Sequence, residues 1–283
     1  MTNAGLVLEG GALRGVFTAG VLDYLMERNI EFPYVVGVSA GSCNAVDYVS
    51  KQIGRTKECF IPKDKGEKYL SPMNILKGKA LYDMDKVFID FPEKIYPFDF
   101  KAYFASSVQC EIVVTNCLTG KAEYMESKGE RAGLMNICRA SSSMPLVSSM
   151  VKLNGIPYLD GGLSDSIPLL HSIQKGYEKN VVILTRNAKY RKKLSSKTRK
   201  LYQYYYREYP ELTKTILNRS LMYNKQLDYI EDLEKKGKIF VIRPEEKVVS
   251  RVEQNQEKLN AFYYHGYQIM EREFQRMTEY LEQ

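Results

Sequence analysis

Two short apolar segments lie within the first fifty residues, and each is followed at once by a turn and a helical pattern. Residues 4–9 (AGLVLE) and 34–38 (YVVGV) are typical of buried strands. The apolar spacing that follows each of them, to about residues 27 and 49, is typical of helices. A strand–turn–helix unit that occurs twice at this spacing predicts an α/β protein with a mostly parallel central sheet flanked by helices.

The remainder of the first 190 residues contains more strand-like segments. Further strands are predicted at residues 110–116, 121–125, 151–159 and 181–185. The first two flank Thr119-Gly120, and the third contains Asn154-Gly155, a dipeptide typical of two-residue hairpin turns. Residues 54–105 are less regular, with four prolines and with aromatic side chains between charges. We interpret them as a cap or lid over the edge of the sheet.

The composition changes near residue 190, and we place a domain boundary there. This predicts an α/β domain over residues 1–190 and a mainly helical C-terminal extension over 191–283, with one strand-like piece at 238–242 (KIFVI). The last helix carries apolar residues near helical spacing. Such a stripe usually packs against the main domain, and dimerisation is the alternative.

Charge and residue usage narrow the function classes. Lys and Arg number 41 against 34 Asp and Glu, a mildly basic balance that favours an anionic surface without identifying one. Five cysteines without a C-x-x-C spacing argue against a disulfide framework or a zinc cluster, and two histidines argue against a histidine-rich metal site. The N-terminus lacks signal-peptide features, and no apolar stretch is long enough to span a bilayer. We therefore expect a cytoplasmic protein without a metal, with peripheral membrane contact as an alternative.

The sharpest local motif is the G-x-S-x-G sequence from Gly37 to Gly41, centred on Ser39. A nucleophilic serine needs a tight strand-to-helix turn, and glycines two residues away on each side remove side chains that would clash there. The N-terminus of the following helix would also direct N–H groups at a developing oxyanion. The alternative is a turn that is tight for structural reasons alone.

A glycine-rich loop follows the first predicted strand. It reads Gly10-Gly11-Ala12-Leu13-Arg14-Gly15. Backbone N–H groups of such a loop can hold a phosphate or the oxyanion of an acyl intermediate. The dinucleotide fingerprint lacks its second glycine here, and no acidic residue ends the second strand, so dinucleotide binding is the weaker interpretation.

A third motif, Asp160-Gly161-Gly162, follows the predicted hairpin at residues 151–159. An aspartate on a glycine turn is often only an Asx turn. A serine nucleophile needs a base, however, and Asp160 could accept the Ser39 proton directly. An Asp–His pair with His171 is the alternative, although a lone histidine in a helix-like stretch is more often structural.

These three motifs, in this order, resemble the bacterial patatin-like phospholipases, whose pattern is a glycine-rich loop, a G-x-S-x-G turn and a distant D-G-[GA]. The segment from Ala140 to Pro145 also looks like a small-residue stretch of that family. The resemblance covers about residues 4–186 and implies a three-layer fold and a Ser–Asp dyad hydrolase without cofactor, acting on an acyl lipid. It implies that Ser39 attacks the ester and that Asp160 acts as the base.

For the loop, the resemblance implies that N–H groups of Gly10, Gly11 and Ala12 stabilise the oxyanion. Many relatives have a third glycine where this chain has Ala12. An alanine strains the loop if φ must be positive there and is harmless if only its N–H is used. We expect Arg14 to hold the loop by hydrogen bonds.

A basic run begins at Arg186 and ends at Lys200, with eight Lys or Arg and no acidic residue. We interpret it as a solvated linker, with contact to an anionic membrane as the alternative. A nucleic-acid partner is not expected, because no recognised binding module surrounds the run. Two further functional hypotheses remain open: an acyltransferase or thioesterase that uses the same acyl-enzyme, and a non-catalytic module that binds lipid or nucleotide through the loop from Gly10 to Gly15.

Overall fold

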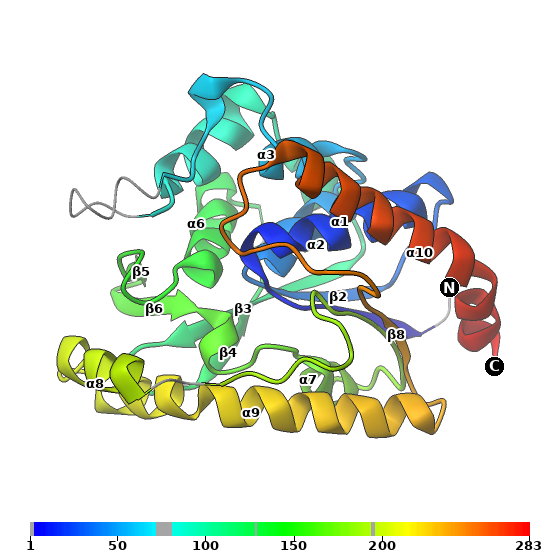
Figure 1. Ribbon diagram of the computed structural model, residues 1–283. Coiled ribbons are helices and arrows are strands. Elements are labelled where there is room, and N and C mark those ends of the chain that lie inside the picture. The colour runs from blue at the N-terminus through cyan, green and yellow to red at the C-terminus, as the bar shows by residue number, and fades with distance from the viewer. Residues whose placement is uncertain (1–2, 72–80, 128, 194–195) are drawn as a thin grey trace.

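One mixed sheet organises the computed structural model, which describes residues 3–71, 81–127, 129–193 and 196–283 (Figure 1). In these residues the sheet has eight strands in the order β5-β6-β3-β2-β1-β7-β8, and β4 pairs with β3. The strands are β1 (Ala4–Leu8), β2 (Tyr34–Val38), β3 (Gln109–Asn116), β4 (Ala122–Met125), β5 (Val151–Leu153), β6 (Ile156–Asp160), β7 (Lys179–Ile183) and β8 (Phe240–Ile242).

The central strands β3, β2, β1, β7 and β8 are parallel, whereas β4, β5 and β6 run antiparallel to their neighbours. The predicted α/β class and both predicted hairpins are therefore confirmed. The parallel strands require crossover connections, which the helices supply.

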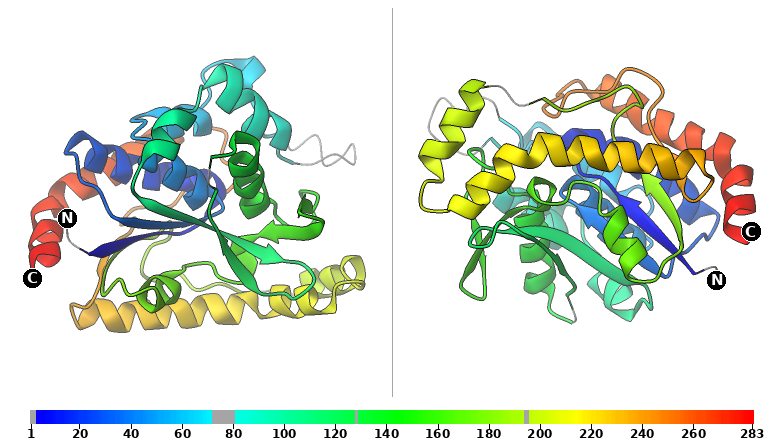
Figure 2. Two further views of the ribbon diagram at one scale, coloured as in Figure 1. Left: turned by 180° about the vertical axis from the view of Figure 1, so that it is seen from behind. Right: turned by 90° about the horizontal axis from the view of Figure 1, so that it is seen from below.

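Helices cover both faces of the sheet, as the views from the front, from behind and from below show (Figures 1 and 2). Helices α1, α2 and α10 lie on one face, and α7 and α9 lie on the other. The α-helices are α1 (Gly15–Glu27), α2 (Ala40–Val49), α3 (Arg55–Phe60), α5 (Phe100–Ala105), α6 (Arg131–Ser142), α7 (Leu169–Gln174), α8 (Ser196–Tyr205), α9 (Pro210–Lys235) and α10 (Gln256–Glu282). Three short 3₁₀ turns are η1 (Ala12–Arg14), η2 (Lys65–Glu67) and η4 (Gly161–Leu163). The longer η3 (Lys86–Ile95) is a π-helix.

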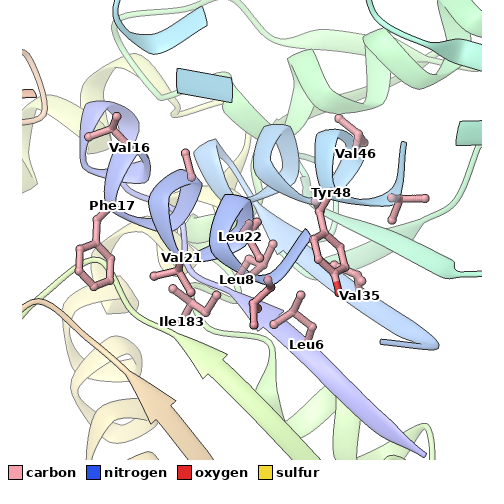
Figure 3. Close-up of a cluster of buried hydrophobic side chains, with 14 of the residues drawn as sticks. Leu6, Leu8, Val16, Phe17, Val21, Leu22, Val35, Val46, Tyr48 and Ile183 are labelled. Atoms are coloured by element: carbon pink, nitrogen blue, oxygen red, sulfur yellow. The ribbon is translucent and has the colours of Figure 1, made fainter. Parts of the chain in front are cut away.

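The core follows from the alternation of side chains along the strands. In β1, Leu6 and Leu8 face α1 and α2, where they pack with residues such as Leu22 (Figure 3). Val7 points to the other face and joins a second cluster that includes Tyr223 of α9. Because both faces of the sheet are covered here, β1 (AGLVL) and β2 (YVVGV) do not alternate between apolar and polar side chains.

The chain beyond β7 is built into the same sheet. The strand predicted at 238–242 is β8, which pairs in parallel with β7. Helix α10 packs along α1, and a Cβ at either Gly20 or Gly266 would collide with a backbone carbonyl of the other helix. The apolar stripe of the last helix is therefore core, as predicted. The domain boundary near residue 190 stays a prediction.

Candidate active site

Ser39 occupies the turn between β2 and α2, with φ +56° and ψ −123°. A positive φ is costly for a residue with a side chain, so the surrounding structure holds the serine in this conformation. A Cβ at Gly37 would collide with the carbonyl of Gly41, and a Cβ at Gly41 would collide with the carbonyl of Leu8. The glycines predicted around Ser39 thus permit the tight turn.

Ser141, near the end of α6, forms a hydrogen bond with the backbone of this turn. The N–H of Ser39 donates to Ser141 Oγ at 2.9 Å, and Ser141 Oγ donates to the carbonyl of Val113 at 2.6 Å. The sequence singled out the segment that contains Ser141 but gave this serine no role. Only the hydrogen bonds across the fold reveal that it ties the turn to β3.

Sheet register brings Asp160 to Ser39. Val38, at the end of β2, pairs with Val113 of β3, and Asp160, at the end of β6, pairs with the adjacent Val114. Two strands on opposite sides of β3 therefore deliver the serine and the aspartate to one edge of the sheet. Both side chains line the same cavity, and the nearby Ser39 side chain acts on the pKa of Asp160 as a hydrogen-bond partner.

The Asp160 carboxylate is buried, and burial raises its pKa. The charge of Arg219 and the hydrogen bond from Ser39 oppose that shift. The N–H of Gly162 also donates to Asp160 Oδ1 at 2.7 Å. Asp160 therefore caps the glycine turn, as an Asx turn would, and faces Ser39 as well.

The glycine-rich loop lies against the serine. A Cβ at Gly10 would come within 2.9 Å of Ser39 Cβ, so only glycine allows this approach. Thr185 Oγ1 donates to the carbonyl of Gly10 at 2.9 Å and fixes the loop. Within the described ranges, the N–H groups of Gly10, Gly11 and Ala12 donate to no acceptor. They are available for a ligand atom beside Ser39.

Ala12 has φ +50°, so the structure selects the strained alternative for this residue. We expect Ala12→Gly to raise the free energy of unfolding by about 1 kcal/mol, because alanine at positive φ costs about 1–2 kcal/mol. Urea denaturation measures the change. Ala45→Gly in the middle of α2 is the matched control and should lower stability by about 1 kcal/mol or more. A loss of stability in Ala12→Gly as well would contradict strain at this position.

The motifs meet in a small cavity with a free volume of about 30 Å³, room for little more than ordered water. The predicted site residues that line it are Gly10, Gly11, Ala12, Arg14, Ser39, Asp160 and Gly162. The other predicted residues lie behind this surface, and a Cβ at any of them would collide with a neighbouring atom: Gly15, Gly37, Gly41 and Gly161. These last four therefore shape the site without lining it.

Arg14 differs from its expected role. We predicted that it holds the loop by hydrogen bonds, but its guanidinium donates none to any described residue. It lines the cavity instead, and burial together with the charge of Arg186 lowers its pKa to about 10. Its charge faces the site because η1 turns the chain inward directly after the glycines.

The cavity is lined by residues after β7 rather than by the segment at 54–105, whose interpretation as a cap over the edge of the sheet stays a prediction. None of the described residues of the 54–105 segment lines the cavity. Residues from the predicted linker do so instead, namely Arg186, Tyr190 and Lys192. The solvated-linker interpretation is therefore wrong for these three, because the chain after β7 turns back over the cavity that contains Ser39. Residues 194–195 of the run lie outside the described residues.

α9 and the loop after β8 complete the cavity with residues that no motif indicated. Arg219 and Tyr223 project from α9, and Arg251 comes from the loop before α10. The only sequence signal for the two arginines is the basic balance of the chain, which does not show where the charges lie.

His171 belongs to a separate cluster. Its Nε2 lies 2.6 Å from Glu111 Oε2, and its ring stacks on Tyr124. Lys175 and Tyr34 also donate to Glu111. Burial raises the pKa of the Glu111 carboxyl, but the hydrogen bonds from His171, Lys175 and Tyr34 outweigh burial and lower this pKa to about 2. His171 does not line the cavity that contains Ser39. The arrangement thus favours Asp160 as the partner of the serine.

The described residues contain no cluster of three side chains that could hold a metal ion. No helix among them is both long and apolar enough to span a bilayer.

A strained serine turn on a mixed α/β sheet, facing a buried aspartate and a glycine-rich loop, defines the class of site. The family model for patatin-like phospholipases matches residues 6–173, and the chain belongs to that family. A second model, the domain of unknown function DUF6363, matches residues 209–282. The cavity is therefore lined by residues from both matched regions.

Two relatives and one solved structure resemble the chain. The chain is 30% identical over 192 residues to the uncharacterized protein YjjU of Escherichia coli K12, covering 64% of this chain and 51% of YjjU. It is 26% identical over 194 residues to the probable lipid hydrolase 463L of Invertebrate iridescent virus 6, covering 62% and 65% of the two chains. These matches span between half and two thirds of each relative. The crystal structure of VipD from Legionella pneumophila shares the fold, with a TM-score of 0.51, 13% identity, and coverage of 99% of this chain and 66% of that one.

Proposed function

We propose that the protein hydrolyses acyl ester bonds of lipids through Ser39 and Asp160. The observation that carries the proposal is the meeting of these two side chains in one cavity, next to three free N–H groups of the glycine-rich loop. Family membership and a relative named as a probable lipid hydrolase support the substrate class.

In this mechanism Asp160 accepts the proton of Ser39 as Ser39 Oγ attacks the ester carbonyl. The carbonyl oxygen becomes an oxyanion and accepts hydrogen bonds from N–H groups of Gly10, Gly11 and Ala12. Collapse of the intermediate expels the alcohol, which takes the proton from Asp160, and leaves an acyl-enzyme on Ser39. Asp160 then deprotonates a water molecule that attacks the acyl-enzyme, and it returns this proton to Ser39 Oγ as the carboxylic acid leaves.

Burial of the carboxylate fits this role. A base must hold a proton for part of the cycle, and a pKa raised by burial makes the protonated form more accessible. The hydrogen bond from Gly162 to Oδ1 orients the carboxylate, so that it approaches the serine in one geometry.

A fluorophosphonate probe tests the proposal, because it reacts with activated serines. We expect stoichiometric labelling of the wild type, with the adduct mapped to Ser39 by mass spectrometry, and no labelling of Ser39→Ala. A non-catalytic binding module has no activated serine. An unlabelled wild type, or a label elsewhere that Ser39→Ala retains, would contradict the proposed chemistry.

A further inference from the structure

Five cationic side chains surround the cavity that contains Ser39. They come from three separate parts of the chain: η1, the segment after β7, and the region beyond residue 209. They are Arg14, Arg186, Lys192, Arg219 and Arg251. The carboxylates that line the same cavity are Glu9 and Asp160, so the cations outnumber them.

Neither carboxylate neutralises these cations by direct contact. Glu9 accepts hydrogen bonds from the N–H of Thr185 at 2.6 Å and from Tyr223 OH at 2.7 Å. Asp160 accepts a hydrogen bond from the N–H of Gly162 and lines the cavity beside Ser39. Across the described part of the chain, none of the five cations forms an ion pair with a carboxylate.

A neighbouring arginine shows that the protein pairs its cations elsewhere. Arg191 lies between two of the cavity residues in sequence, yet it points outward and contacts Asp228 and Glu231 of α9 at 3.0 Å. This segment is tied to α9 by hydrogen bonds in both directions between Lys192 and Asn224. The cations that turn inward are therefore held at the cavity without an acidic partner.

Three of the guanidinium groups have a buried Nε–H without any acceptor: those of Arg14, Arg186 and Arg219. Arg14 is only 3% exposed. A buried donor without a partner costs free energy, as does a buried charge, so such groups mark a place where a ligand supplies the acceptor.

Crowding of the cations affects the pKa of Lys192. Burial and the charges of Arg219, Arg251 and Arg14 lower the pKa of Lys192 to about 6, although the charge of Glu9 opposes this. Lys192 Nζ lies 3.8 Å from the centre of the Tyr223 ring, and Arg186 Cζ lies 4.1 Å from the centre of the Tyr190 ring. An anion among these groups would relieve their mutual repulsion and favour a charged Lys192.

We propose that the segment after β7, α9 and the loop before α10 complete the active site as a phosphate-binding site, and that the ester substrate carries a phosphate monoester without a cationic headgroup. Guanidinium forks match phosphate oxygens, and several of them suit a dianion better than a single negative charge. A choline or ethanolamine group would place a further cation beside the cluster, which electrostatic repulsion disfavours. A phosphate must displace water and move some of the long side chains, because the free volume is small.

The substrate part of this inference rests on the proposed function, and the wild type tests it. We expect kcat/KM for oleoyl lysophosphatidic acid to exceed that for oleoyl lysophosphatidylcholine and monooleoylglycerol by at least about tenfold, the value of one charge-assisted hydrogen bond. All three are presented in the same neutral mixed micelles. Equal values, with ester hydrolysis intact, would overturn the substrate class and leave the proposed function standing.

Variants test whether the cations of the cavity cause the preference for the phosphate substrate. Arg186→Gln and Arg251→Gln should each reduce kcat/KM for the phosphate substrate about tenfold and reduce its advantage over monooleoylglycerol. Arg191→Gln removes a cation from the same segment, but outside the cavity, and should leave the preference unchanged. A preference that persists in both cavity variants, or that disappears in Arg191→Gln, would overturn the assignment.

Inorganic phosphate tests the site without any ester. Isothermal titration of Ser39→Ala with phosphate should show saturable binding, weakened about tenfold by Arg251→Gln but not by Arg191→Gln in the same background. Binding without ester turnover in the wild type would support the anion site while the proposed function fails. Binding without a preference for the lysophospholipid would indicate a site for free phosphate and overturn the substrate class. Absence of saturable binding would overturn the site itself.

Discussion

Ser39→Ala is expected to reduce ester hydrolysis to the background rate, a loss of up to about 10⁶-fold, the cost of removing a nucleophilic serine in another hydrolase. The substitution removes only the hydroxyl, and the turn around Ser39 keeps the contacts of its N–H with Ser141. Hydrolysis of a short-chain p-nitrophenyl ester measures the loss, and circular dichroism confirms the fold.

Ser50→Ala provides a matched control for this substitution. Ser50 is also buried and follows the same helix, but its hydroxyl donates to the carbonyl of Asp47, away from the cavity. We expect it to retain turnover. A folded Ser39→Ala protein with undiminished turnover would show that the serine is not the nucleophile.

Asp160→Asn is expected to reduce kcat/KM by about 10² to 10⁴-fold, the usual contribution of general base catalysis. Asparagine keeps the shape of the side chain and an acceptor for the N–H of Gly162, but it cannot take the serine proton. Asp165→Asn is the control, because Asp165 is a buried carboxylate on the same turn that binds Tyr124 and Gln226 instead. Retained activity in Asp160→Asn would show that another base operates.

The pH profile gives this prediction a second readout. The base must be deprotonated to act, and burial raises the pKa of Asp160 above the ordinary value of about 4. Activity should therefore rise with pH through that raised pKa and be lost, as pH falls, earlier than an exposed aspartate would allow. The residual activity of Asp160→Asn should lack this limb. An acidic limb that is unchanged in the variant would assign the titration to another group.

Local patterns were sufficient for much of the fold. The apolar strands, the glycines around Ser39 and the turn at Asn154-Gly155 report local backbone requirements, and the structure confirms the elements that they predict. The sequence also predicts the strand β8 and the buried stripe of α10, because burial of one face spaces the apolar residues at the period of the element. The strained φ of Ala12 could only be stated as one of two alternatives, since its sign depends on the path of the loop.

Long-range contacts account for what the sequence analysis missed. Nothing in the segment around Ser141 indicates that its hydroxyl bridges the serine turn and β3. The expected roles of Arg14, Arg186 and Lys192 were wrong for a related reason: only the tertiary structure shows that the fold turns these charged side chains toward the cavity. No spacing in the sequence relates Arg219 or Arg251 to Ser39.

The sequence by itself thus determined the α/β class, the three motifs and their order, because backbone sterics and burial periodicity act over a few neighbouring residues. Tertiary structure alone decided that β2 and β6 flank β3 and bring Ser39 to Asp160. It also decided that the chain beyond β7 surrounds that pair with unpaired cations. Strand order and helix placement join residues more than a hundred positions apart, and the energy of such contacts depends on the whole packed fold rather than on any local pattern.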